Sequence, residues 1–192
     1  MATQKQRSET TRQTLLDAFR AAFLARGYEA TTTQQILSET GLSKGALYHH
    51  FRSKREIIEA LYEQDSHAAI DRAIAAVAPD ASPLARLKAS YLAWTRTVRD
   101  PDIAKILFEI GPAALGEQRS KAIEEAASNR PIKRLLALAI KAEEIAPPDE
   151  GLLIALLNAL VAEAALFHLH TGRDPQETLA ATFSAIFAGM RP

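Results

Sequence analysis

The chain lacks several features that would point to particular classes of protein. Its 192 residues include no cysteine, which excludes disulfide bonds, thiolate nucleophiles and thiolate metal ligands. No uninterrupted apolar run approaches the roughly 20 residues of a membrane-spanning helix. The nearest candidate, residues 151–169, is interrupted by Asn158, Glu163 and His168. The first ten residues also lack the apolar core of a signal peptide. We therefore expect a cytoplasmic protein with no membrane association.

The chain also has no net charge, because 23 basic residues balance 23 acidic ones. Taken alone, this balance argues against nucleic-acid binding. The charges are unevenly distributed, however: residues 1–55 contain nine basic and four acidic residues, or +5. The remainder has 14 basic and 19 acidic residues, or −5. A basic N-terminal segment on an acidic body is expected when only one domain touches phosphate.

Residues 32–54 predict two short helices joined by a tight turn. Thr32 and Gln35 have the spacing of a capping box, which would begin the first helix. Gly41 can adopt the left-handed conformation that ends this helix, and Ser43 can cap the next one. We expect the apolar residues to pack inward: Ile36, Leu42, Leu47 and Phe51. This is the layout of a helix-turn-helix, whose second helix enters the major groove of DNA.

The outward face of the second helix carries residue types that suit DNA. The small pair Gly45 and Ala46 would let the backbone approach base edges. Lys44, and Lys54 at the start of the following helix, suit phosphate or guanine, and the Tyr48 hydroxyl suits a phosphate oxygen. The candidate DNA-binding residues are Thr32, Thr33, Ser43, Lys44, Gly45, Ala46, Tyr48, His49 and Lys54.

This segment resembles the DNA-binding domain of the tetracycline-repressor (TetR) family. The matching residues are Thr32-Thr33, Ile36, Gly41-Leu42-Ser43-Lys44-Gly45, Leu47-Tyr48-His49-His50-Phe51 and Ser53-Lys54. Thr40 departs from the pattern, since the family often has alanine there. The resemblance implies a homodimeric transcriptional regulator, most simply a repressor, that a small-molecule effector releases from a palindromic double-stranded DNA operator. It implies no cofactor.

Nearly all of the remaining chain reads as helix, so the predicted fold class is all-α with about nine helices. A three-helix DNA-binding domain is expected at residues 1–52, and a larger helical ligand-binding and dimerisation domain at residues 53–192. Three later helices share a start signal, a Ser or Asp cap followed by proline: Ser82-Pro83, Asp100-Pro101 and Asp174-Pro175. We expect Gly111-Pro112 to end a helix and Pro131 to break or kink another.

The last two predicted helices are the candidate subunit interface. The helix at residues 149–171 is apolar on almost all sides, which predicts burial all round. The helix at residues 175–189 adds one apolar face. Such a pair could form an intramolecular core, but the resemblance favours a two-fold dimer. The candidate interface residues are Leu153, Leu157, Leu160, Phe183 and Phe187.

The resemblance also implies an effector pocket in the middle helices. Its candidate residues are Tyr62, Tyr91, Trp94, Phe108, Glu163 and Phe167. Aromatic residues at helical spacing also build ordinary cores, so a core role stays open for each of them. Glu163 lies among apolar residues, where an unpaired carboxylate is costly. It could pair with an arginine, lie at an interface rim or face a ligand.

We find no pattern that indicates catalysis or a metal site. His168 and His170 would lie on different faces of a helix, and no glycine-rich phosphate loop is present. The expectation is therefore a protein without enzymatic activity. Two alternatives remain: a helical enzyme with an unrecognised site, and an architectural DNA-binding protein without an effector. The sequence names neither the effector nor the operator, and it does not separate a repressor from an activator.

Overall fold

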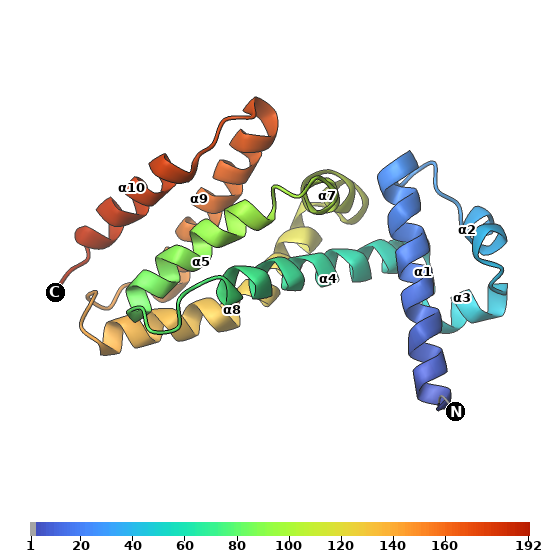
Figure 1. Cartoon of the computed structure of the whole chain (residues 1–192), viewed down its shortest axis with the longest axis horizontal. Helices are drawn as coiled ribbons and strands as arrows, with labels where there is room; N and C mark the ends of the chain where they lie inside the picture. The colour runs from blue at the N-terminus through green and yellow to red at the C-terminus, as the bar shows by residue number, and fades with distance from the viewer. Residues whose placement is uncertain (1–2) are drawn as a thin grey trace. The chain divides into compact units, whose positions relative to one another are not determined.

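The computed structural model describes residues 3–192, and these residues form helices without any strand (Figure 1). The all-α prediction is confirmed, and the described residues form nine helices if the continuous run 101–115 counts as one. The elements in chain order are α1 (Gln4–Arg26), α2 (Thr33–Thr40), α3 (Lys44–His50), α4 (Lys54–Ala75), α5 (Pro83–Thr97), α6 (Pro101–Ala104), the π-helix η1 (Lys105–Ile110), α7 (Gly111–Leu115), α8 (Glu117–Lys141), α9 (Glu150–Thr171) and α10 (Gln176–Ala188).

The chain divides into two compact units. Unit 1 comprises the residues up to Asp65 together with residues 105–123, and unit 2 comprises residues 66–104 and 124–192. Both α4 and α8 therefore begin in unit 1 and end in unit 2. The predicted domain boundary after residue 52 falls just before α4 begins, and it stays a prediction.

Unit 1 is built on one face of α1. Leu15, Phe19 and Phe23 recur every four residues, as an apolar helix face requires, and none is exposed. The rings of Phe19 and Phe23 lie 5.6 Å apart, and that of Tyr28 follows at 5.4 Å from Phe23. Ile36 of α2 is fully buried as well. The buried residues of α1 form the apolar surface against which α2 and α3 pack.

The prediction that Gly111-Pro112 ends a helix is wrong. The helical run continues through both residues as α7 and ends at Gly116, which has φ 81°. Pro112 stands in the first turn of α7, where a missing backbone N–H is tolerated. The preceding turn, η1, is π-helical, a rare conformation that is often found at functional sites.

Of the break or kink predicted at Pro131, the break is absent, because Pro131 lies inside the single helix α8. The kink stays a prediction. Buried residues on both sides of the proline, among them Ala127 and Leu135, hold the helix in place. Tertiary packing thus outweighs the hydrogen bond that proline removes.

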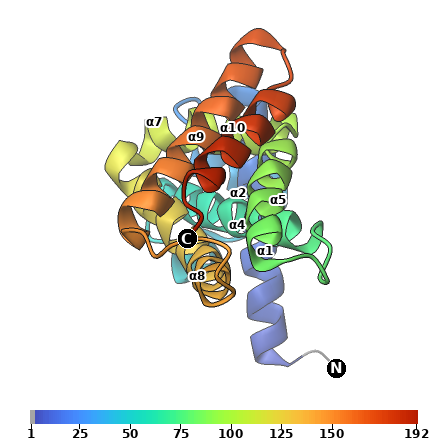
Figure 2. The ribbon, with the colours of Figure 1, turned by 90° about the vertical axis from the view of Figure 1, so that its left-hand side faces the viewer.

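Unit 2 has its own core, formed by α5, the C-terminal part of α8, α9 and α10. Figure 2 shows α5, α9 and α10 side by side. Leu87 and Phe183 are fully buried in this core, with Leu136 and Leu157. The Tyr91 ring stacks against Phe183 at 5.5 Å.

The expectation that α9 is buried on all sides is wrong. One face packs into the core of unit 2 through Leu153, Ile154, Leu157, Val161 and Ala165. The opposite face leaves Leu152 60% exposed and Leu156 55% exposed, followed by Phe167. By length and composition α9 could cross a membrane, and it is the one such helix in residues 3–192. The partly covered core helix of a soluble protein has the same composition.

Candidate nucleic-acid interface and effector residues

The helices α2 and α3 begin and end at the caps that the sequence predicts. The Thr32 hydroxyl accepts the Gln35 N–H at 3.3 Å, and the Gln35 side chain accepts the Thr32 N–H at 3.2 Å. Gly41 has φ 68°, in the left-handed region that favours glycine. Ser43 then accepts the Ala46 N–H at 3.1 Å. Local hydrogen bonds thus fix where α3 begins.

The outer face of α3 is open. Leu47 and Phe51 are 1% and 2% exposed and anchor the helix, whereas Tyr48 is 48% exposed. The Lys44 ammonium lies 5.8 Å from the centre of the Tyr48 ring, within range of a cation–π interaction. A Cβ on Gly45 would meet only the Ser43 hydroxyl, at 3.8 Å. The remaining predicted DNA-binding residues of α3 are the exposed His49 and the half-buried Ala46.

Lys54 has partners within unit 1. Its ammonium donates to the backbone carbonyls of Tyr28 at 2.8 Å and Thr31 at 3.1 Å. It also lies 4.1 Å from the centre of the Tyr28 ring. Two of its three N–H groups are thereby used to hold the start of α4 against the loop before α2. Contact with phosphate stays a prediction for Lys54, as it does for Thr32 and Thr33 at the start of α2.

Several long-range contacts in unit 1 carry no signal in the sequence. Arg20 of α1 donates to both carboxylate oxygens of Asp65 in α4, each at 2.7 Å. Lys105 of η1 donates to the Leu24 carbonyl at 2.7 Å, across 81 positions of sequence. Such partners share no periodicity, so pattern reasoning could not pair them. They attach α4 and η1 to the C-terminal half of α1.

Two predicted effector residues, Tyr62 and Tyr91, are built into cores. Tyr62 of unit 1 is fully buried, and its hydroxyl donates to the Leu107 carbonyl at 3.3 Å. Tyr91 of unit 2 donates its hydroxyl to the Asn158 side chain at 3.2 Å. Burial raises the pKa of Tyr91 far above its ordinary value. Both hydroxyl groups therefore already have protein partners.

The other predicted effector residues are less enclosed. Phe108 of unit 1 and Trp94 of unit 2 are half-buried, and Trp94 packs against the core of unit 2. Glu163 and Phe167 lie on the exposed face of α9. The Arg173 guanidinium lies 5.4 Å from the centre of the Phe167 ring. The six candidates are thus divided between the two units, and their role in ligand binding stays a prediction.

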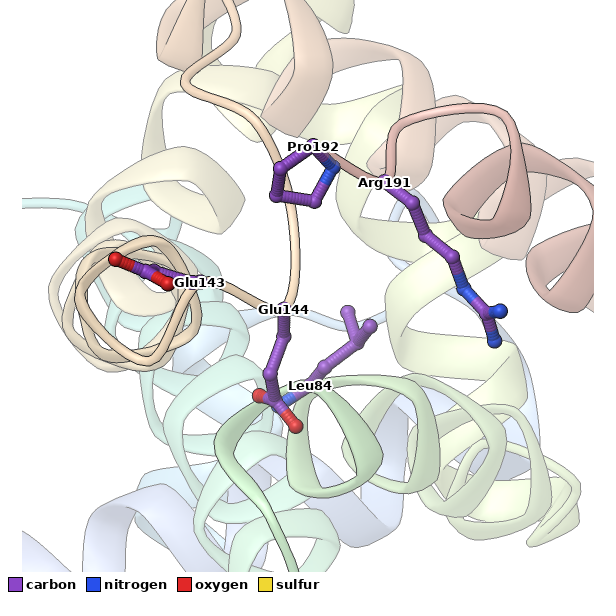
Figure 3. A pocket seen from close by; sticks show the side chains of 5 residues that line it. All are labelled: Leu84, Glu143, Glu144, Arg191 and Pro192. Carbon is purple, nitrogen blue, oxygen red and sulfur yellow. The ribbon is translucent and has the colours of Figure 1, made fainter.

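Unit 2 contains a surface hollow that the sequence did not indicate. Its volume is about 490 Å³, and it is lined by Leu84, Glu143, Glu144, Arg191 and Pro192. Glu144 and Arg191 stand on opposite sides of it (Figure 3). The Glu144 carboxylate accepts the Leu84 N–H at 2.8 Å. It therefore satisfies a backbone donor in the first turn of α5. None of the predicted effector residues lines the hollow.

The predicted interface residues lie mostly inside unit 2. Leu153, Leu157, Phe183 and Phe187 are at most 7% exposed in a single chain, and Leu160 is half-buried. The sequence predicted which helices are apolar, but it could not tell which side of each faces its own core. The exposed surface of these helices is a different set: Leu152, Leu156 and Phe167 on α9, with small residues Ala181, Ala185 and Ala188 on α10.

Curated proteins similar to this chain include several that are named as transcriptional regulators, together with a transposon protein. The chain is 30% identical to the HTH-type transcriptional repressor KstR2 of Mycobacterium tuberculosis over 104 residues, which cover 54% of this chain and 52% of KstR2. It is 34% identical to the transposon Tn10 TetC protein of Escherichia coli over 61 residues, or 32% of this chain and 31% of TetC. The matches span about half of these relatives or less.

Similarity to solved structures and to family descriptions extends over most of the chain. A crystal structure of a TetR-family transcriptional regulator from Pectobacterium atrosepticum has a TM-score of 0.69 at 25% identity, covering 97% of this chain and 94% of that one. Residues 15–61 match the family described as bacterial regulatory proteins, tetR family. Residues 84–190 match the tetracyclin repressor-like C-terminal domain. The chain therefore belongs to the TetR family of bacterial regulatory proteins.

Proposed function

We propose that the protein is a transcriptional repressor that binds a palindromic DNA operator as a homodimer in the cytoplasm. The observation that carries this proposal is the exposed face of α3, where Lys44, Tyr48 and His49 project from a helix anchored by buried Leu47 and Phe51. In a dimer, two such helices would enter successive major grooves, roughly 34–36 Å apart. The residues up to 52 would form the DNA-binding domain, and residues 53–192 the effector-binding and dimerisation domain.

The exposed apolar face of α9 supports the proposed dimer. Leu152 and Leu156 are a helical turn apart and more than half exposed, and Phe167 continues the same face. Clustered large apolar side chains on a surface commonly mark an interaction site. The residues of the neighbouring α10 that are exposed, rather than half-buried, are all small or polar, among them Ala181 and Ala185. Small side chains allow a partner helix to approach closely, so we assign the interface to this surface.

A small-molecule effector is the proposed regulator of DNA binding. It would bind within residues 53–192 and release the repressor from DNA. It can do so only to the extent that it binds the DNA-free state more tightly. We propose that the protein has no enzymatic activity and uses no cofactor.

Selection from a random pool of DNA duplexes tests the function. The full chain should enrich a palindrome, and the affinity for it should fall steeply as salt is added, because phosphate contacts release counterions. Failure to enrich any sequence would refute the proposed repressor function. Sequence-independent binding that no compound in a small-molecule library alters would instead indicate an architectural protein. Turnover of a library compound without DNA binding would indicate an enzyme.

A further inference from the structure

The N-terminal part of α1 contributes no buried residue to the core of unit 1. Every side chain from Thr3 to Thr14 is polar or charged, and each is exposed or half-buried. The first buried residue of α1 is Leu15. A capping box between Thr3 and Gln6 begins the helix. Most helical stability in proteins comes from packing, yet this segment places no side chain in the core of unit 1. Core packing therefore does not account for a helix here. We name residues 3–14 the N-terminal arm.

The basic side chains of the arm have no acidic partner. Lys5, Arg7 and Arg12 form no ion pair within residues 3–192, the part of the chain that the structure describes. Further along the same helix the arginines are paired: Arg20 with Asp65 and Arg26 with Glu39. The positive charges of the arm are therefore available to a partner of opposite charge.

The arm continues past the C-terminal end of α3 (Figure 1). The Arg12 guanidinium lies 5.2 Å from the centre of the ring of Phe51, the residue that ends α3. The charges of both Arg12 and Glu9 act on His50, the last residue of α3. One side of the arm thus adjoins the helix that is proposed to read DNA.

Helical periodicity separates the two remaining basic residues of the arm. Lys5 lies four residues before Glu9 and seven before Arg12, so it shares their side and continues it by about 6 Å along the axis. Arg7 lies two residues after Lys5, which places it on the far side of the helix. Glu9 is the one acid on the side that faces α3.

We propose that the side of the arm marked by Lys5 is a second phosphate-binding surface, which contacts the DNA backbone beside the groove that α3 occupies. This inference rests on the proposed DNA-binding function. The arm lies outside residues 15–61, the segment that matches the family's DNA-binding domain. A lysine is suited to this task because it acts as a point charge toward phosphate and carries no sequence information.

The arm therefore adds affinity and leaves sequence preference unchanged. Removing Lys5 should weaken binding to all duplexes alike. Removing Arg7 should have a much smaller effect, although the two substitutions delete the same charge from the same exposed helix. This pair of variants separates a directed contact from a general loss of positive charge.

The experiment measures the affinity of wild type, Lys5→Ala and Arg7→Ala for one duplex selected by the wild type, and for a scrambled duplex, across a salt series. Lys5→Ala should weaken both complexes by roughly three- to ten-fold at low salt. The slope of log affinity against log salt should fall by about one per subunit. Circular dichroism should show unchanged helical content, because Lys5 is exposed.

Equal losses in Lys5→Ala and Arg7→Ala would overturn the assignment to one side of the arm. Unchanged salt slopes in both variants would overturn the phosphate contact, while the repressor function would stand. If the wild type selects no duplex at all, the proposed function itself fails.

Discussion

The ring of Tyr62 lies directly against the backbone of Gly111, and a Cβ at Gly111 would overlap the ring. Gly111→Ala should therefore destabilise the protein by about 1–3 kcal/mol, the usual cost of overpacking a core. Thermal or urea unfolding would measure this loss. Gly45→Ala is the matched control, since its Cβ meets only the Ser43 hydroxyl at 3.8 Å. Stability equal to wild type in Gly111→Ala would contradict the contact.

Substitutions at two adjacent residues of α9, one on its exposed face and one on its buried face, test the proposed dimer interface. Leu156→Glu places a charge on the exposed face and should split the dimer while leaving the monomer folded. Leu157→Glu places the same charge in the core of unit 2, where Leu157 is 1% exposed, and should unfold unit 2 at a cost of several kcal/mol. Sedimentation and circular dichroism would separate the two results. A Leu156→Glu protein that keeps its dimeric mass would refute the proposed interface.

Lys44 and Lys54 should behave differently when each is replaced by alanine. Lys44→Ala should weaken DNA binding, and it should also relax sequence preference if Lys44 contacts a base. The melting temperature should not change, because Lys44 is exposed. Lys54→Ala should lower the melting temperature, because two backbone carbonyls lose their donor. If Lys54 also contacts phosphate, the salt slope falls by about one per subunit. Unchanged DNA affinity in both variants would contradict the assigned DNA-binding surface.

Acidification should destabilise unit 1 through His50. Burial lowers the pKa of His50 below its ordinary 6.5, and the charges of His49 and Arg12 lower it further. The folded state therefore prefers the neutral ring. Its contribution to stability is fully present above pH 6.5 and is lost as the pH falls through the folded-state pKa. Melting temperatures between neutral and mildly acidic pH would reveal this, and His50→Gln should flatten the profile. An equally steep profile in the variant would exclude His50 as the cause.

Trp94 provides an optical probe of the effector, since it is the single tryptophan in the sequence. A compound that binds near it should change its fluorescence, raise the melting temperature and weaken operator binding, because coupling between two sites is reciprocal. Trp94→Ala should then reduce effector affinity more than DNA affinity. If Trp94→Ala is destabilised yet binds the effector normally once folded, the residue belongs to the core alone.

Local features of the fold were predictable from the sequence because their partners are close in the chain. The caps at Thr32 and Ser43 and the left-handed Gly41 each depend on residues within a few positions. The capping box of Thr3 with Gln6, which begins α1, is another local feature of this kind.

Features decided by tertiary packing were not predictable. Pro131 is a helix breaker by its chemistry, yet buried neighbours keep α8 continuous. The side of α9 that faces the core cannot be read from a helix that is apolar all round. No pattern in the sequence pairs Tyr91, a predicted effector residue, with Phe183, a predicted interface residue, although their rings lie 5.5 Å apart within one core.

The contacts that join η1 and α7 to the N-terminal helices within unit 1 bear on protein engineering. Lys105 bonds to the Leu24 carbonyl, and Arg55 donates to the Leu115 carbonyl at 2.9 Å. The DNA-binding half is thus completed by a segment that comes much later in the chain. A chimera that transplants only residues 1–52 onto another regulator would leave the Leu24 carbonyl without Lys105 and the Arg20 guanidinium without Asp65. Exchange of operator specificity between relatives should therefore succeed best when residues 105–123 travel with the N-terminal segment.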